Sequence, residues 1–467
     1  MSRLTTFCSL VILSALALFA SEADTLHFGR FGKVTIYKET QQPRQVVLFV
    51  SGDGGWNLGV IDMARALSSL NALVIGIDIS HYLKELEKSP EKCSYPAADF
   101  EMLSKYVQKK LNCEEYTAPV LVGYSSGATL VYAVLVQAPA TTFQGAISLG
   151  FCPDLPLSKA MCRGSGLEWE IGPNGKGYSF LPAPDLQPEW LVLQGDIDQV
   201  CSISQAKSFV KQVRGAKIIS LPKVGHGFSV QKNWLPQFKE AFLNMTTTTS
   251  LNPSAVEAGI LRDLPLIELS ADNSQSNLMA VHITGDGGWG VTDKGIGEGL
   301  AKSGIPVVGL NSLKYFWTRR TPDETAGDLQ KIILYYLTKW KKEKLILIGY
   351  SFGADVMPFL VNRLDPEVRS KVKLLVLLGA SHKAAFEFHL TDWIGGSHSN
   401  NKLAVRPEIE KLKDIKILCF YGQDDQDNLC PQLPPDLVTA ISLKGGHRIG
   451  GNFDPIVQQI LGIMETH

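Results

Sequence analysis

The feature that most constrains the fold is an internal repeat. The run VVLFVSGDGGWN at 46–57 returns as LMAVHITGDGGWG at 278–290, and VLVGYSSGAT at 120–129 returns as LILIGYSFGAD at 345–355. A histidine in a glycine-rich loop ends each series, His226 in the first and His447 in the second. Three motifs that recur in one order at nearly one spacing indicate two copies of one domain.

Within each copy, short Val/Ile/Leu runs alternate with longer amphipathic segments. In the second copy the runs AVHIT, PVVGLN, LILIGY, LLVLLGA and IKILCFYG are interleaved with stretches such as KGIGEGLAKSG and TAGDLQKIILYYLTKWKKE. Strands that are apolar on both faces and are joined by helices favour a parallel sheet that is covered on both sides. The sequence therefore predicts an α/β fold made of two tandem domains, each a mostly parallel sheet with helices on both faces.

Composition marks the N-terminal segment and the seam between the copies. The first residues have one positive charge, a short apolar core and then small residues, which predicts a secretory signal at 1–23. The apolar core is shorter than the ~20 residues of a spanning helix, so an uncleaved anchor is the weaker alternative. A Thr-rich stretch with a proline predicts a linker at 249–260. We therefore expect domains at 24–248 and 261–467.

The charge and residue composition exclude several classes of function. The formal net charge is -1 and the 45 Lys and Arg residues are dispersed, so nothing indicates a nucleic-acid partner. No His/Cys/Asp cluster has the spacing of metal ligands, so we expect neither a metal nor another cofactor.

The cysteines predict disulfides. Cys8 belongs to the signal, and an exported chain meets an oxidising compartment in which the other cysteines pair. Their odd number leaves one free thiol, and Cys152, Cys162 and Cys201 cannot be paired from the sequence. The expected pairs are Cys93 with Cys113 and Cys419 with Cys430.

The repeated Gly-x-Ser-x-Gly pattern predicts a nucleophile in each copy. A buried strand-like run precedes GYSSG at 123–127 and GYSFG at 349–353, and small residues follow. In this pattern a tight strand-to-helix turn lifts the serine hydroxyl above the sheet, and glycines avoid clashes in the turn. Ser125 and Ser351 are therefore candidate nucleophiles of two α/β-hydrolase-like domains. The alternative is a turn that only packs a helix on a strand.

An acid and a base follow each serine in the order Ser, Asp, His that this fold uses. Asp198 and Asp425 each come three residues after the glycine that closes a strand-like run, and His226 and His447 follow the next run. The histidine would take the serine proton, and the aspartate would hold its tautomer and stabilise the imidazolium. The alternative acids are Asp196, Asp424 and Asp427.

The G-D-G-G-W loops are predicted to bind the oxyanion. One donor should be the backbone N–H after each nucleophile, at Ser126 and Phe352. The second should come from the loop itself, where glycine lets the backbone approach a carbonyl. Its candidates are Gly54 and Gly55, and Gly287 and Gly288 beside Asp286. A turn that only packs Trp56 and Trp289 is the alternative, and no phosphate-binding loop motif follows.

The motifs of the second copy resemble a known family. ITGDGGW, SLKYFWTRRTPDETAGDL and IGYSFGADVMPF, with the two loops that carry Asp425 and His447, closely resemble the VirJ domain. The arrangement of a signal and two copies resembles the AcvB/VirJ family of bacterial virulence proteins over essentially the whole mature chain. The resemblance implies an α/β-hydrolase fold and assigns Ser351, Asp425 and His447 as the catalytic triad, with Ser125, Asp198 and His226 as a second triad.

The same resemblance implies a substrate and a location. It implies a periplasmic serine hydrolase, in contact with the inner membrane, that removes the lysyl or alanyl group from aminoacyl-phosphatidylglycerol, a cationic membrane lipid. It also implies a link to virulence and to components of type IV secretion. The lipid's ammonium would pair with Asp286 and its phosphate with Arg319 and Arg320, because guanidinium groups bind phosphate in a bidentate way. Turn capping by Asp286 and a solvated arginine pair are the alternatives.

Other functions remain open at the level of sequence. In the first copy SHYLKELEKSPEKCSYPAADFE replaces the KYFWTRRTPDETAGDL segment, so that copy either positions lipid or hydrolyses a different substrate. An esterase for soluble substrates would use the same triad. A non-catalytic accessory protein of type IV secretion would use the fold only as a scaffold.

Overall fold

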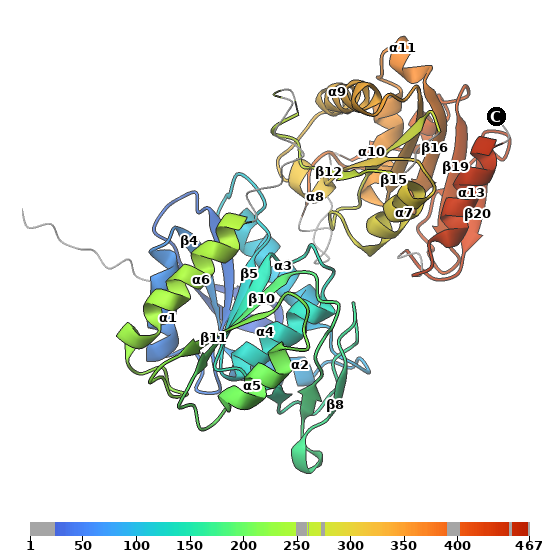
Figure 1. Ribbon diagram of the computed structural model, residues 1–467. Coiled ribbons are helices and arrows are strands. Elements are labelled where there is room, and N and C mark those ends of the chain that lie inside the picture. Colours follow the sequence, from blue (N-terminus) through green and yellow to red (C-terminus); the bar gives the residue numbers. More distant parts are fainter. Residues whose placement is uncertain are drawn as a thin grey trace, which may run out of the picture.

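The computed structural model describes most of the chain as two sheet-bearing domains (Figure 1). The predicted signal and nearly all of the predicted linker lie outside the described residues. Among the described residues no helix is long and apolar enough to cross a membrane. The described residues are 24–248, 259, 261–271, 276–389, 402–447 and 451–465.

The first domain is built on an eight-stranded sheet with the order β1-β2-β4-β3-β5-β6-β10-β11. The pairs β1/β2 and β2/β4 are antiparallel, and all other neighbours are parallel. The strands are β1 Asp24–Phe28, β2 Gly32–Tyr37, β3 Gln45–Val50, β4 Ala72–Ile77, β5 Val120–Tyr124, β6 Gly145–Leu149, β10 Glu189–Gly195 and β11 Lys217–Leu221. A small antiparallel sheet adds β7 Asp154–Leu155, β8 Trp169–Ile171 and β9 Tyr178–Phe180.

The second domain repeats this plan with seven strands in the order β12-β14-β13-β15-β16-β19-β20. Only the β12/β14 pair is antiparallel. The strands are β12 Leu266–Leu269, β13 Leu278–Ile283, β14 Val307–Leu310, β15 Lys344–Tyr350, β16 Val372–Leu378, β19 Lys416–Gly422 and β20 Val438–Leu443, and a separate ladder pairs β17 Lys383–Ala384 with β18 Leu403–Ala404.

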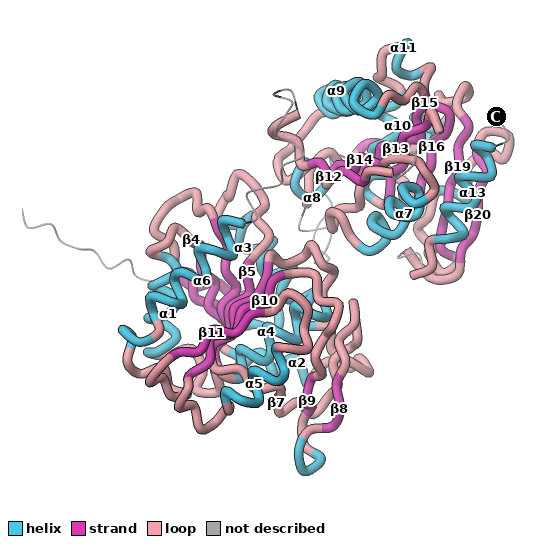
Figure 2. The backbone as a smooth tube through the Cα atoms, viewed as in Figure 1, coloured by secondary structure: helices cyan, strands magenta, loops and turns pink. Residues whose placement is uncertain are grey.

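Helices cover both faces of each sheet, as the tube in Figure 2 shows. In the first domain α1 and α6 share one apolar cluster with the sheet, and α2, α3, α4 and α5 share the other. In the second, α7 and α13 pack on one face and α9, α10 and α12 on the other. The helices are α1 Leu58–Ser68, α2 Ile79–Glu87, α3 Pro96–Lys110, α4 Ser126–Gln137, α5 Ile203–Val210, α6 Leu235–Thr248, α7 Val291–Lys302, α8 Ser312–Tyr315, α9 Pro322–Trp340, α10 Phe352–Val361, α11 Pro366–Arg369, α12 Arg406–Ile409 and α13 Asp454–Glu465.

The predicted fold class is confirmed. Runs such as LILIGY are buried along almost their whole length because both faces of β15 are covered, which is why the sequence shows no alternation of polar and apolar residues there. Trp56 and Trp289 pack against Gly76 on β4 and Gly309 on β14, where a Cβ would come within 2.1 Å and 2.3 Å of the indole rings. The tryptophans of both G-D-G-G-W loops therefore anchor these loops to the neighbouring strand.

The disulfides of the folded chain agree only in part with the predicted pairs. The Cys419–Cys430 bond is confirmed, and among the described residues the free thiol is Cys113. The predicted pairing of Cys93 with Cys113 is wrong, since Cys93 bonds to Cys162 with a Cα–Cα distance of 5.0 Å. The helix α3 separates Cys93 from Cys113, and its 15 residues span about 22 Å, well beyond disulfide reach.

A third disulfide joins Cys152 to Cys201, the two cysteines that follow β6 and β10. Because these strands are parallel neighbours, their carboxyl ends lie side by side. This bond therefore ties together two loops at the edge of the first sheet where the candidate acid Asp198 lies.

The two domains touch through the end of α3 and the α8 region. The Trp317 indole N–H donates to the Cys113 carbonyl (2.9 Å), and the Lys109 ammonium donates to the Trp317 carbonyl (2.5 Å). An apolar cluster of Tyr116, Leu313, Trp317 and Phe388 spans the contact. Part of the KYFWTRR segment thus serves as a domain interface.

The second domain carries a buried ionisable pair where the first is apolar. His282 on β13 and Asp293 on α7 take the places of Phe49 and Val60. The Nε2 and Oδ1 atoms lie 3.1 Å apart outside hydrogen-bond geometry, and the other Asp293 oxygen accepts the Gly290 N–H (3.0 Å). Burying two such groups costs more solvation than an imperfectly aligned pair returns.

This pair generates a stability prediction. His282→Phe leaves the Asp293 carboxyl group buried without the imidazole beside it, and we expect a loss of about 3 kcal/mol or more in the free energy of unfolding. Adding Asp293→Val, which recreates the apolar pair of the first domain, should recover most of that loss. Urea unfolding of the single and double variants measures both steps. A double variant no more stable than His282→Phe would show that the pair contributes in another way.

Candidate functional site

Both candidate nucleophiles lie on strained turns between a strand and a helix. Ser125 follows β5 with φ 55°, and Ser351 follows β15 with φ 51°, in the left-handed region that a serine rarely adopts. Their backbone N–H groups donate to Leu149 and Leu378 on the next strand. A Cβ on Gly353 would lie 2.1 Å from the Ile283 carbonyl oxygen, so only glycine fits there. The turns have the nucleophile-elbow geometry predicted from the sequence.

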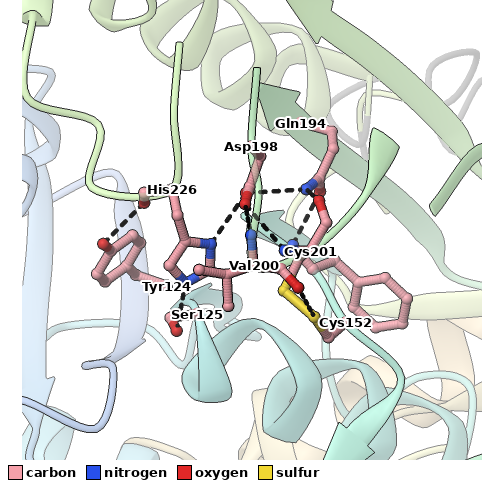
Figure 3. Close-up of polar contacts among 9 residues, drawn as sticks. Tyr124, Ser125, Cys152, Gln194, Asp198, Val200, Cys201 and His226 are labelled. Carbon is pink, nitrogen blue, oxygen red and sulfur yellow. Dashed lines mark hydrogen bonds and ion pairs between the residues drawn. A yellow bond between two sulfur atoms is a disulfide. The ribbon is translucent and has the colours of Figure 1, made fainter. Parts of the chain in front are cut away.

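The first domain brings its three predicted side chains together (Figure 3). The distance from Ser125 Oγ to His226 Nε2 is 2.9 Å, and that from His226 Nδ1 to Asp198 Oδ2 is also 2.9 Å. The Asp198 carboxylate also accepts hydrogen bonds from the backbone N–H groups of Val200 and Cys201, both at 2.9 Å. The carboxylate is therefore held rigidly, and it can fix the orientation of the imidazole.

The second domain assembles the same arrangement. Ser351 Oγ lies 2.8 Å from His447 Nε2, and His447 Nδ1 lies 2.9 Å from Asp425 Oδ2. Burial raises the pKa of Asp425, but hydrogen bonds from Asn428 and His447 outweigh burial, so its pKa lies below the ordinary value. The site is more open than the first, because the His447 side chain is 46% exposed and that of His226 19%.

The alternative acids point elsewhere. Asp196 accepts the Lys223 N–H (2.8 Å) and so braces the loop that leads to His226. Asp427 is almost fully exposed, with His382 at 3.9 Å, and Asp424 is also exposed. The geometry therefore favours Asp198 and Asp425 as the partners of the histidines.

The G-D-G-G-W loops lie against the nucleophiles. A Cβ on Gly52 would come within 3.1 Å of the Ser125 side chain, and one on Gly285 within 3.6 Å of Ser351. The N–H groups of Gly55 and Gly288 donate to the carbonyls of Gly52 and Gly285 and close each turn, at 2.9 Å and 3.0 Å. These two N–H groups are thus used within the loop, and the oxyanion role of Gly55 and Gly288 stays a prediction.

The other predicted oxyanion donors are the N–H groups of Ser126 and Phe352, which directly follow the two serines, and the loop residues Gly54 and Gly287. Ser126 and Phe352 begin α4 and α10, so their N–H groups belong to unsatisfied first turns of helices. Gly54 and Gly287 precede the closing glycines of the loops, and their role stays a prediction.

The residues proposed from sequence to contact the lipid are only partly near the serine. Asp286 is half-buried beside Ser351's loop and lies close enough to Asp355 to raise the pKa of that group. Arg320 stacks its guanidinium 5.0 Å from the centre of the Tyr315 ring, and Arg319 is exposed. The arginine pair stays a prediction for phosphate binding.

Sequence reasoning missed two side chains that organise the first triad. The Tyr124 hydroxyl donates to the His226 carbonyl (2.9 Å) and so holds the histidine loop. The Gln194 amide donates to Asp198 Oδ2 (3.2 Å) and to the Cys201 carbonyl (2.7 Å). Tyr124 precedes the nucleophile within the motif itself, which was a usable signal. Gln194 lies on a buried strand, and only its polarity within an apolar run marked it.

Sequence reasoning also missed Asp355 in the second domain. It lies one helical turn after Ser351, on α10, and its carboxylate accepts the Ser381 N–H (2.7 Å) and hydroxyl (2.6 Å). Burial raises its pKa to about 7, against the effect of the Ser381 hydrogen bonds. Asp286 raises it further and Lys402 lowers it.

The surroundings of Asp355 place it in the active site. Ser381 follows Gly379, whose Cβ, if present, would lie 3.3 Å from the His447 ring. The carboxylate is therefore bounded by the helix after the nucleophile, by the loop that faces the histidine, and by the loop that carries Asp286. Within the described residues no Lys or Arg forms an ion pair with it.

The position equivalent to Asp355 in the first domain is neutral. Thr129 lies one turn after Ser125 and donates its hydroxyl to the Cys152 carbonyl (2.6 Å). In the described part of the chain no group of three or more His, Cys, Asp or Glu side chains is arranged to hold a metal ion.

Three solved structures show what the chain is similar to. They are the esterase domain of a Rhodothermus marinus protein (15% identity, 48% of this chain and 98% of that chain, TM-score 0.34), a dienelactone hydrolase from Anabaena variabilis (15%, 48% and 96%, 0.35), and an α/β serine hydrolase without lid from Xanthomonas campestris (19%, 50% and 97%, 0.32).

One protein family matches more than half of the chain. The family described as "Bacterial virulence protein (VirJ)" matches residues 44–150 and 277–467. The first range ends before Asp198 and His226, and the second contains the whole second triad. No curated protein matches the chain.

The elbow geometry generates a second prediction. Gly353→Ala places a Cβ against the Ile283 carbonyl, and we expect a loss of stability of about 2 kcal/mol or more with a displaced serine. Gly327→Ala is the matched control, because Gly327 lies exposed on α9 with open space around it and should gain about 1 kcal/mol. Thermal unfolding compares the two. Equal stability of both variants would mean that α10 does not pack on β13 as described.

Proposed function

The chain belongs to the family of VirJ bacterial virulence proteins, and from this we propose that its second domain is a serine hydrolase that cleaves the aminoacyl ester of aminoacyl-phosphatidylglycerol in the periplasm. Its product would be a free amino acid, lysine or alanine, and phosphatidylglycerol. Such a reaction lowers the positive charge of the membrane surface, through which the protein would support virulence or type IV secretion.

The chemical step follows from the geometry of the second triad. Ser351 Oγ attacks the ester carbonyl while His447 Nε2 takes its proton, and Asp425 stabilises the resulting imidazolium. The oxyanion is bound by the Phe352 N–H and by an N–H of the loop before Gly288, at Asp286 or Gly287. The imidazolium then protonates the glycerol oxygen as it leaves, and water releases the amino acid from Ser351 by the reverse sequence.

The observation that carries the substrate assignment is Asp355. Every aminoacyl ester has an α-ammonium next to its scissile carbonyl, so its enzyme needs an acceptor of positive charge close to the nucleophile. A buried carboxylate one helical turn after Ser351, with its pKa raised by burial, is stabilised when a cation binds to it. Asp286 adds negative charge on the same side. This site suits a cationic acyl group and does not depend on which amino acid it is.

Two other functions predict different results. An esterase for soluble substrates would use the same triad but would be indifferent to a lipid surface. A non-catalytic accessory protein of type IV secretion would keep its biological activity without Ser351, whereas the hydrolase would lose it. The cationic acyl site favours the hydrolase over the accessory protein, which does not need Asp355, and the dependence on a lipid surface separates it from an esterase for soluble aminoacyl esters.

The direct test measures release of free lysine and alanine from liposomes that contain lysyl- or alanyl-phosphatidylglycerol. Ser351→Ala should abolish release, because the nucleophile is lost. Asp355→Asn should raise KM about tenfold, the expected loss for one hydrogen bond to a charged group. Asp436→Asn is the matched control, since Asp436 is exposed and lies before β20, whose opposite end leads to His447, and it should behave as the unmutated chain.

The outcomes separate the three functions. Release that persists at full rate in Ser351→Ala would exclude the second triad as the source of activity. Hydrolysis of lysine ethyl ester in solution at the same rate as the liposomal lipid would indicate the soluble esterase. No release from either lipid, together with full virulence of Ser351→Ala, would indicate the accessory protein.

The raised pKa of Asp355 adds a pH dependence. The carboxyl binds an ammonium well only when ionised, so KM for the lysyl lipid should fall as the pH rises through about 7. Asp355→Asn should have a high KM that does not change with pH. KM is measured on lysyl-lipid liposomes for the unmutated chain and for Asp355→Asn. If KM changed with pH in the same way for both, Asp355 would be excluded from substrate binding.

Asp355 also makes the free energy of unfolding depend on pH. A rise in pH that improves substrate binding should lower the stability of the folded chain. The pKa of Asp355 is higher in the folded chain than the ordinary 3.8, so the folded state holds a proton that the unfolded chain has lost. Its contribution to the free energy of unfolding is therefore present below about pH 4 and is lost as the pH rises to about 7. Asp355→Asn should flatten this part of the stability profile, measured by urea unfolding.

A further inference from the structure

The first domain has a second arrangement of Ser, His and Asp side chains, two of which lie outside the matched family segments. The Asp198 and His226 side chains lie beyond residue 150, where the family match to the first copy ends. Even so, its two hydrogen-bond distances, 2.9 Å and 2.9 Å, are those of the second triad to within 0.1 Å. A triad that had lost its role would have no physical reason to keep the strained φ of 55° at Ser125.

The first triad is also the more firmly supported of the two. Asp198 accepts hydrogen bonds from Gln194, Val200 and Cys201 in addition to His226, as the dashed lines of Figure 3 show. The Cys152–Cys201 disulfide closes the same loop onto the end of β6. The acid is thus held by its own hydrogen bonds and by a covalent bond in its loop.

A cavity lies next to the first triad, and its lining includes Tyr124 and Gly227, the chain neighbours of Ser125 and His226, but neither of those two residues. It has a volume of about 380 Å³ and lies between the Gly52 loop, α1 and the loop after His226. Tyr124, Met63, Phe228 and Trp234 give it apolar walls. Asp62 is the one charged lining residue, and its carboxylate already accepts a hydrogen bond from Gln231 (3.2 Å).

The second domain differs at one wall of this cavity. Gly295 takes the place of Asp62, and the Phe453 ring packs so closely on it that a Cβ would lie 2.1 Å from a ring carbon. The side chains at this position of the first helix therefore differ between the two copies.

The polarity around the first serine differs as well. Thr129 replaces Asp355, so the first domain lacks the buried carboxylate that suits an ammonium. Three of the large apolar side chains that are exposed in the described chain, Ile197, Val200 and Val230, lie in the loops next to Asp198 and His226. The rim of this site therefore carries exposed apolar side chains, with the exposed carboxylate of Asp196 in the same loop.

From these contacts we infer that the first domain is a second serine hydrolase, specific for esters of neutral, apolar acyl groups. Ser125 Oγ forms a bond to the acyl carbon while its proton passes to His226 Nε2. The C–O bond to the alcohol breaks, and the alcohol oxygen takes that proton. Water then attacks the acyl-serine, gives a proton to His226, and releases the carboxylic acid as Ser125 recovers its proton.

The test uses the full mature chain with the second site silenced by Ser351→Ala. In this background ethyl butyrate should be hydrolysed, with uptake of base measured at constant pH. Adding Ser125→Ala should reduce the rate at least about 100-fold, to the uncatalysed level. Adding Ser208→Ala instead is the matched control, because this exposed serine on α5 lies outside the site, and it should leave the rate unchanged.

Selectivity is measured in the same background. The kcat/KM for ethyl butyrate should exceed that for lysine ethyl ester at least about tenfold, because Thr129 stands where the second domain has the buried carboxylate of Asp355. Equal or reversed preference would overturn the neutral acyl class. A rate for Ser351→Ala no higher than that of the double variant would overturn the second active site itself.

A labelling experiment keeps the inference testable without mutation. The unmutated chain, incubated with a neutral fluorophosphonate, should carry the phosphonyl group on the peptide that contains Ser125 as well as on the one that contains Ser351. Peptide mass analysis reads the two sites separately. A folded chain labelled on Ser351 alone would contradict the inference for the first domain and leave the lipid hydrolase of the second domain unaffected.

Discussion

Both sites depend on one close contact. The helix that follows each serine, α4 or α10, approaches the end of a neighbouring strand of the sheet, β3 or β13. Gly127 and Gly353 lie so near the carbonyl ends of β3 and β13 that a single Cβ would collide with backbone oxygen. This contact permits the left-handed φ of Ser125 and Ser351 and sets both hydroxyls at the carboxyl edge of a sheet. The acid and base loops leave their own strands at that same edge. The acid and the base of each site are therefore arranged around a turn that needs glycine at Gly127 or Gly353.

Duplication has preserved this turn and its triads while the surroundings have changed. One copy has the neutral Thr129 and a cavity beside its G-D-G-G-W loop, and the other has the buried carboxylate of Asp355 and the Phe453 ring packed on Gly295. The cores differ as well, since the buried side chains of His282 and Asp293 replace two apolar side chains. The residues of the two triads are thus the same, and the side chains around them are different.

The contact between the domains links the two sites in one molecule. Trp317, in the segment that distinguishes the second copy, donates to the Cys113 carbonyl of the first domain. The Thr141 hydroxyl of the first domain donates to the carbonyl of Trp289, at the end of the second G-D-G-G-W loop (2.7 Å). A first-domain side chain therefore helps to hold a loop that borders the second nucleophile, which gives the first domain a structural role in addition to its own triad.

The sequence by itself determined the repeat, the α/β class, both elbows and the six residues of the triads. These features are local patterns, such as a buried run, a glycine-flanked serine and an acid at a fixed distance from a strand end, whose geometry the backbone imposes. Tertiary structure alone decided the pairing of Cys93 with Cys162, the use of the Gly55 and Gly288 N–H groups within their turns, and the place of Asp355 beside Ser381. Each of these depends on which distant segments meet across the sheet edge, and spacing along the chain carries no information about such contacts.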